Sequence, residues 1–431
     1  MLRSLYFVAT NRANLSLKEW SIWLGELPWS LRWFPLLVLL RPLVDNLFFL
    51  KEVSPFLSPP YIVGVLSPLL CLLALVRFKH PRFGAGDKAF YLWGGFLLLS
   101  SLLVLLQNPL DLVSIEFMLK LSMPVYLFAL LRILIRSRRD LNGILFSFLY
   151  SAIFVAAILL YEILVSPISL EESRGLQRIQ GSFGDVVSYG MYIAFTSIIT
   201  IYHYLSQSEA RSAYRALLLL IGVAVINILG LFNIHHTATY GVFLTLVGMF
   251  FLFNFTGKNQ GTSIVLLASL VLVLSFIGSE LVSEKISPLL ETDLAVYQGE
   301  KESDKLLHGR VGRWRLMLDN FFMEAPHLQI FGLTLGLQPV FPYIGIGSHN
   351  DFFRILFATG FLGLGAYLLF LLRIIAKARK QVRELRFLTY ATLTALIFYS
   401  ISITPTFYAP FLYMALSVFA FTLLPSSSQS P

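Results

Sequence analysis

Four side chains that can carry a proton or bind an anion lie close together in the chain: His349, Asn350, Asp351 and Arg354. They stand directly before the apolar segment 355–372. Ionisable groups at a membrane boundary are costly, so they usually have a function. His349 is a candidate general base because imidazole titrates near working pH; the alternative is a histidine wetted at a helix start. Arg354 follows Asp351 by three residues, so a local ion pair also accounts for both charges.

A second group of candidates consists of arginines in segment 309–324, which is predicted to form an amphipathic helix ending before Pro326. Arg310 and Arg313 are three residues apart and share one face, whereas Arg315 points about 140° away from Arg310. Two planar guanidinium groups suit a phosphate clamp. The alternative, which we favour for Arg315, is an interfacial helix whose arginines meet lipid headgroups. The predicted apolar stripe consists of Trp314, Met317, Leu318 and Phe321.

A third charged segment lies upstream and contains Arg174, Arg178 and Asp185. Glycines at 181 and 184 permit close approach of the backbone to a ligand. By itself, a loop of this kind does not identify a site.

Two pairs of opposite charges lie inside predicted membrane spans: Arg41 with Asp45, and Glu116 with Lys120. Each pair is spaced i,i+4, so self-neutralisation on one helix face is the first expectation. Charges inside a membrane also raise a functional hypothesis. The single cysteine, Cys71, lies in an apolar segment, which excludes disulfides and cysteine-based metal sites.

The composition places these candidates in an integral membrane protein. Hydrophobic residues make up 57% of the chain and charged residues only 13%, well below the charge content of soluble domains. Apolar segments of about 20 residues recur, each long enough to cross a hydrocarbon core of about 30 Å. We predict an all-α membrane protein with about twelve transmembrane helices. The expected spans lie near 33–50, 57–76, 89–107, 112–131, 141–165, 186–205, 216–233, 238–255, 262–279, 351–372, 387–404 and 407–424.

The basic residues assign the two sides of the membrane. When successive spans cross the membrane in alternating directions, most lysines and arginines fall on one side. The positive-inside rule makes that side cytoplasmic, and both termini lie on it. The net charge of +9 is therefore mostly a topology signal, and no nucleic-acid partner is expected. The arginines that fall on the outer side against this bias are Arg174, Arg178, Arg310, Arg313 and Arg315.

The predicted organisation has five parts. Residues 1–28 form a cytoplasmic or interfacial lead-in, 29–279 form transmembrane helices 1–9, and 280–350 form a long outer loop with an amphipathic helix and catalytic elements. Residues 351–424 form transmembrane helices 10–12, and 425–431 form a cytoplasmic tail. Long loops are uncommon unless functional.

Short motifs follow one another in a characteristic order. Segment 309–314 reads Gly-Arg-Val-Gly-Arg-Trp, a glycine-rich turn occupies 331–336, and Ser-His-Asn-Asp at 348–351 enters a helix with Gly360 and Gly363. This series resembles the O-antigen ligase and polysaccharide polymerase family. Two further segments resemble that family's upstream elements, namely 178–185 and 41–45.

The chain departs from the family pattern at two places. Thr239 is followed by Tyr240, where the family often has an arginine, and Ala358-Thr359 precede the Gly-x-x-Gly end, where a glutamate is common. One phosphate-binding arginine and one carboxylate base of the family pattern therefore have no counterpart at these positions. The missing carboxylate favours His349 as the base.

The resemblance implies a GT-C-like fold without metal or cofactor. It implies an inverting transfer of glycan from undecaprenyl-pyrophosphate to an acceptor hydroxyl at the outer face of the bacterial inner membrane. Cations on the departing pyrophosphate and a base near the hydroxyl are what such a reaction needs. The expected catalytic residues are His349, Arg310 and Arg178. The expected substrate-binding residues are Arg313, Asn350, Arg354, Asp185 and Arg174.

The expected function is polymerisation of O-antigen or exopolysaccharide repeat units. Ligation of a glycan to lipid A core, or to a protein, is the close alternative because the catalytic parts are shared. A polysaccharide or lipid transporter is the alternative of another class, although internal repeats are not evident in the sequence. The expected partners are the lipid-linked glycan, the bilayer, a glycan or lipid acceptor, and other polysaccharide-assembly proteins.

Overall fold

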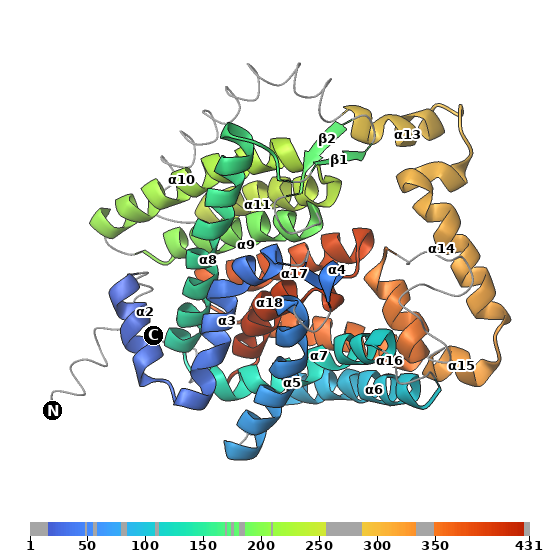
Figure 1. Cartoon of the computed structure of the whole chain (residues 1–431), viewed down its shortest axis with the longest axis horizontal. Coiled ribbons are helices and arrows are strands. Elements are labelled where there is room, and N and C mark those ends of the chain that lie inside the picture. The colour runs from blue at the N-terminus through green and yellow to red at the C-terminus, as the bar shows by residue number, and fades with distance from the viewer. Residues whose placement is uncertain are drawn as a thin grey trace.

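The computed structural model describes residues 16–47, 50–54, 58–78, 84–107, 112–168, 170–173, 176–180, 186–207, 210–255, 287–332 and 349–425. These ranges are almost entirely helical (Figure 1). The elements are α2 Leu17–Glu26, α3 Trp29–Asn46, α4 Leu50–Val53, α5 Pro59–Arg77, α6 Ala85–Gln107, α7 Leu112–Leu134, α8 Arg138–Leu164, β1 Leu170–Ser173, β2 Leu176–Ile179, α9 Val186–Leu205, α10 Ala210–Ile234, α11 Thr237–Phe255, α13 Ser287–Tyr297, η4 Ser303–Lys305, α14 Leu306–Met323, α15 Pro326–Phe331, α16 Asp351–Ala378, α17 Arg383–Ser402, η5 Pro405–Phe407 and α18 Ala409–Thr422.

Nine helices in the described ranges are long and apolar enough to cross a membrane: α5, α6, α7, α8, α9, α10, α11, α16 and α17. The chain is therefore a multi-pass helical membrane protein. Helix α3 has 18 residues but carries Arg32, Arg41 and Asp45, and the apolar α18 has only 14 residues. The predicted span 262–279 lies outside the described residues, so the total of about twelve stays a prediction.

The predicted outer segment after α8 contains a short β-hairpin. Strand β1 pairs antiparallel with β2, so that Leu170 lies opposite Ile179 and Glu171 lies opposite Arg178. Strand β2 also contacts α10. Figure 1 shows the hairpin at the top of the view, beside α10 and α13.

The predicted amphipathic helix 309–324 is present as α14. Met317 and Phe321 of its apolar stripe are fully buried, with no exposed surface. The element starts slightly earlier than expected, and its first turn is irregular because Gly309 has a φ of 78°. Pro326 ends the helical run as predicted and occupies the first turn of the next helix, α15, where proline is tolerated.

Helices α9, α16 and α18 form much of the interior. All of α18 from Pro410 to Thr422 is buried, and 94% of the apolar window of α9 is buried. Helix α16 packs along α6 through aromatic rings. The ring centroid of Phe90 lies 3.9 Å from that of Phe128 and 5.0 Å from that of Phe370. Such interlocked side chains are what hold helices together in lipid, where burial from water contributes little.

The two ends of the bundle differ in their charged groups. At one end the Arg132 Nε lies 2.7 Å from Asp87 Oδ1, and both side chains are 1% exposed. The Nη1 group of Arg132 also donates to the carbonyl of Ala420 in α18. The opposite end is where α16 begins, and we call it the His349 end. It also contains the end of α3 and the starts of α5, α7 and α18, as the contacts below show.

Helix α16 is broken at Gly360. This residue has φ 66° and ψ −171°, a conformation open mainly to glycine. The carbonyl of Ala358, before the break, accepts a hydrogen bond from the Ser100 hydroxyl at 2.5 Å. A Cβ atom at Gly360 would lie 2.2 Å from the carbonyl oxygen of Ile330. The end of α15 therefore packs directly against the break.

Candidate functional site

The start of α16 is set by Asn350. Its side-chain oxygen accepts a hydrogen bond from the Phe353 amide at 3.1 Å, and its φ of −153° lies outside the helix. Asparagine is a favoured N-cap, and the following Asp351 interacts favourably with the positive end of the helix. His349 precedes the cap with a φ of 46°. The capped helix thus presents His349 just before the membrane span.

Asp351 and Arg354 form the predicted local ion pair. Arg354 donates to Asp351 Oδ1 from Nε at 2.9 Å and from Nη2 at 2.7 Å. Asp351 has no exposed surface and Arg354 is 6% exposed. A buried charge pair is stable only when its remaining groups are also satisfied.

Two residues near α18 complete this cluster, and sequence reasoning missed both. The Thr406 hydroxyl donates to Asp351 Oδ1 at 2.7 Å and also interacts with Nη2 of Arg354. The Arg354 guanidinium carbon lies 3.5 Å from the ring centroid of Phe407, a cation–π contact. Its Nη1 group is buried without a hydrogen-bond partner among the described residues. Arg354 thus retains an unused donor.

His349 lies within the electrostatic influence of the α14 arginines. Partial removal of water by the surrounding protein, then the charges of Arg310 and Arg313, lower the pKa of His349 below its usual value. Each of these causes disfavours the imidazolium form. Part of His349 remains exposed to solvent. The lowered pKa favours the uncharged form of this partly exposed histidine.

Arg310 is itself in a cationic environment. Partial burial and the charge of Arg313 lower the pKa of Arg310, and Asp293 of α13 acts in the opposite direction. Arginine stays protonated even so. The charges of Arg310 and Arg313 therefore repel each other, and an anion bound between them would relieve this repulsion.

Aromatic contacts fix α14 against α16. The ring centroid of Trp314 lies 5.6 Å from that of Phe353, and Phe321 lies 5.1 Å from Phe357. Arg315 is oriented differently: its side chain is 71% exposed and lies 3.9 Å from Asp304. Arg315 is thus exposed, and its predicted contact with lipid headgroups stays a prediction.

The upstream candidates are only partly described. Arg178 lies in β2, is 7% exposed, and belongs to the hairpin that contacts α10. Arg174 and Asp185 lie outside the described residues. In Figure 1 the hairpin lies at the top of the view, whereas α14 runs along the right-hand edge. Among the described candidates, Arg310 and Arg313 interact electrostatically with His349, and the Asp351–Arg354 pair lies in the first turn of the helix that follows His349.

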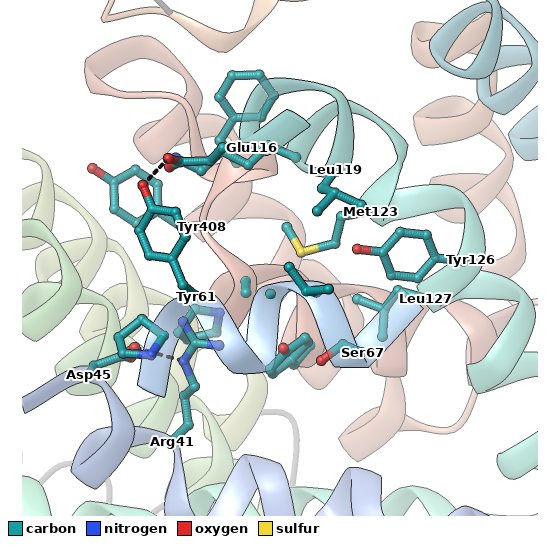
Figure 2. Close-up of a pocket in the computed structure, with 18 of the residues that line it drawn as sticks. Arg41, Asp45, Tyr61, Ser67, Glu116, Leu119, Met123, Tyr126, Leu127 and Tyr408 are labelled. Atoms are coloured by element: carbon teal, nitrogen blue, oxygen red, sulfur yellow. Dashed lines mark hydrogen bonds and ion pairs between the residues drawn. The ribbon is translucent and has the colours of Figure 1, made fainter. Parts of the chain in front are cut away.

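A cavity of about 580 Å³ lies between α3, α5, α7 and α18 (Figure 2). The two predicted ion pairs are present: Arg41 Nε lies 2.8 Å from Asp45 Oδ1, and Lys120 Nζ lies 2.5 Å from Glu116 Oε1. All four side chains line this cavity. The Tyr61 hydroxyl also donates to Glu116. The i,i+4 spacing predicted the pairing but gave no sign that the two pairs share one cavity.

The chemistry available at the His349 end is proton transfer and anion binding. Two guanidinium groups act electrostatically on the imidazole of His349, and the buried carboxylate of Asp351 is already bound by Arg354 and Thr406. Within the described ranges, no group of three or more His, Cys, Asp and Glu side chains is placed to hold a metal ion. Comparisons with protein-family models and with curated proteins found no match to the chain.

Proposed function

We propose that the protein is a glycosyltransferase that moves a glycan from undecaprenyl-pyrophosphate to an acceptor hydroxyl at the outer face of the bacterial inner membrane. The observation that carries this proposal is the position of His349 beside Arg310 and Arg313, with its pKa lowered by partial burial and by their charges. A neutral base and two cations are the groups that such a transfer requires.

In the proposed reaction, the acceptor oxygen attacks the anomeric carbon of the donor from the face opposite to the pyrophosphate. His349 takes the hydroxyl proton as the new glycosidic bond forms, and the bond to the pyrophosphate oxygen breaks with its electron pair. Arg310 and Arg313 stabilise the charge that develops on this leaving group. Attack from the opposite face inverts the anomeric centre.

Other candidates take supporting positions in this proposal. Asn350 holds the start of α16, and therefore the position of His349, through its hydrogen bond to Phe353. Arg354 is proposed to bind substrate oxygens through Nη1, which has no hydrogen-bond partner among the described residues. Arg178, with Arg174 and Asp185, is proposed to bind the glycan or the pyrophosphate from the hairpin side.

We propose polymerisation of O-antigen or exopolysaccharide repeat units as the specific activity, with both chain termini in the cytoplasm. Ligation to lipid A core, or to a protein, uses the same bond changes and differs only in the acceptor. The assay must therefore offer both kinds of acceptor.

The deciding experiment uses purified protein in vesicles with an undecaprenyl-pyrophosphate-linked repeat unit. We expect longer lipid-linked glycans to form, with Arg315→Ala as a matched control that remains active because Arg315 lies at an exposed ion pair. Glycan attached only to added lipid A core would identify the ligase. Movement of the unchanged donor across the membrane without a new glycosidic bond would refute the transferase and identify a transporter.

A further inference from the structure

The cavity between α3, α5, α7 and α18 has a balanced set of charges. Four charged side chains line it among the described residues, Arg41, Asp45, Glu116 and Lys120, and they form two internal ion pairs whose charges cancel. The region around His349 differs, because Arg310 and Arg313 act on it with the same sign. A net-neutral lining gives no overall attraction to a pyrophosphate, whereas paired carboxylates and cations still offer donors and acceptors to hydroxyl groups.

The cavity is also polar at one end and largely apolar at the other. Along α5 its lining runs from Tyr61 to Cys71, a helix distance of about 15 Å. The Tyr61 hydroxyl donates to Glu116 of one charged pair, while Cys71 lies ten residues further along α5. Figure 2 shows this separation, with Arg41 and Asp45 at one side and Leu127 at the other. The lining therefore suits an amphiphile.

The cavity opens beside α5. Gly64 and Val65 line it and are both exposed, and only 17% of the apolar window of α5 is buried. An exposed apolar helix of membrane length faces the hydrocarbon of the bilayer. A molecule with a hydrocarbon chain can therefore reach the cavity from within the membrane.

One wall is shared with the cluster at the start of α16. Phe407 lines the cavity and carries the Arg354 guanidinium on its ring at 3.5 Å. A polar group at this end of the cavity thus lies next to the Asp351–Arg354 pair.

We propose that this cavity binds a glycolipid, an amphiphile whose head is an uncharged, hydroxyl-rich sugar. Its sugar lies among the two ion pairs, Tyr61 and Tyr408 (Figure 2), and its hydrocarbon chain extends toward Cys71. This binding site is argued from the cavity alone and does not depend on the proposed function.

The only cysteine of the chain provides a direct measure of occupancy. Cys71 lines the cavity, so a bound chain should shield its thiol from N-ethylmaleimide. Protein in phospholipid nanodiscs is labelled with and without dodecyl maltoside, and mass spectrometry gives the rate. At a probe concentration about ten times its Kd, labelling should slow about tenfold, because only the empty fraction reacts. Dodecyl phosphate, with the same chain and an anionic head, should protect less.

Two glycine variants separate cavity binding from general effects. A Cβ at Gly64 meets nothing within 4 Å, so Gly64→Leu fills the cavity without a clash at that atom. Gly222 in α10 is equally open and does not line the cavity, so Gly222→Leu is the matched control. We expect native mass spectrometry to show dodecyl maltoside retained by the wild type and Gly222→Leu, and lost from Gly64→Leu. This measurement also replaces the labelling rate if the thiol does not react.

A charge variant tests the basis of head-group selection. Asp45→Asn combined with Glu116→Gln leaves Arg41 and Lys120 uncompensated, so preference should shift toward dodecyl phosphate. Stronger protection by dodecyl phosphate than by dodecyl maltoside in the wild type would overturn the proposal, as would equal retention of the maltoside by Gly64→Leu. These readouts do not require glycan transfer. A bound glycoside in a protein without transferase activity would refute the proposed function and leave the binding site standing.

Discussion

A Cβ atom placed on Gly360 would lie 2.6 Å from the backbone nitrogen of Gly332. Both glycines have positive φ angles, 66° and 110°, and together they allow the end of α15 to contact the break in α16. Because α14 directly precedes α15, this contact helps to hold the arginines of α14 near His349.

Gly360→Ala should therefore impair both stability and activity. An alanine at positive φ costs about 1–2 kcal/mol before any clash, and here the added carbon also meets the backbone of α15. We expect a lower Tm in a thermal-shift assay and a lower rate of transfer. Gly365→Ala is the control, because a Cβ at Gly365 meets nothing within 4 Å. Equal melting temperatures of the two variants would contradict this account.

His349→Ala should abolish glycan transfer while the protein stays folded and inserted. Loss of a general base lowers a rate by about 10²- to 10⁴-fold, and truncation at a partly exposed position removes little packing. The measurement is the initial rate of transfer at equal protein amounts, with size-exclusion profiles as the folding control. Near-normal product from a well-folded variant would end the assignment of His349 as the base.

The pH dependence of kcat/KM should show the effect of the neighbouring arginines on the pKa of His349. A base works in its neutral form, so activity should rise with pH through the pKa of His349, which lies below its usual value. Removing one cation in Arg313→Gln favours the imidazolium and raises this pKa, so the acidic limb of kcat/KM should move to higher pH. Arg315→Gln should leave the limb in place. If the acidic limb of kcat/KM stays at the same pH in Arg313→Gln, a group other than His349 controls the activity.

Arg310→Lys should fail almost as badly as Arg310→Ala. Lysine keeps the charge but cannot supply the two parallel N–H groups of a guanidinium. Loss of a charge-assisted hydrogen bond of about 1.5–3 kcal/mol lowers the rate about 10- to 100-fold. Initial rates for both variants beside Arg315→Ala decide the point. A lysine variant with wild-type activity would show that Arg310 acts as a point charge only.

Transfer should continue in excess EDTA. Guanidinium groups are proposed to stabilise the leaving group in the role that a divalent ion fills in other enzymes. The assay compares initial rates before and after chelation, with magnesium and manganese added back. Activity that disappears with EDTA and returns with either ion would redirect attention to Asp185 and Asp351 as ligands.

Local features of the site were predictable from the sequence. The spacing of Asp351 and Arg354 predicted their ion pair, since i and i+3 residues share a helix face. The apolar stripe of segment 309–324 likewise predicted its buried face, because Met317 and Phe321 recur with the helix period.

Tertiary neighbours were not predictable in the same way. Thr406 reaches Asp351 across 55 residues of sequence, and no local pattern marks a threonine as a distant partner of a carboxylate. The common cavity of the two intramembrane ion pairs also depends on how α3, α5, α7 and α18 pack. The hairpin at 170–179 has strands of only four residues, too short to show an alternation of polar and apolar side chains.

The Arg132–Asp87 pair also bears on how the protein is assembled in the membrane. Helices α6 and α7 are neighbours in sequence, so this ion pair can form as soon as both are inserted. The carbonyl of Ala420 that accepts from Arg132 is synthesised 288 residues later, on a helix that is buried almost throughout. We therefore expect the helices synthesised before α18 to remain loosely packed until α18 is inserted. Insertion of α18 then completes the packing of the interior in a late, cooperative step.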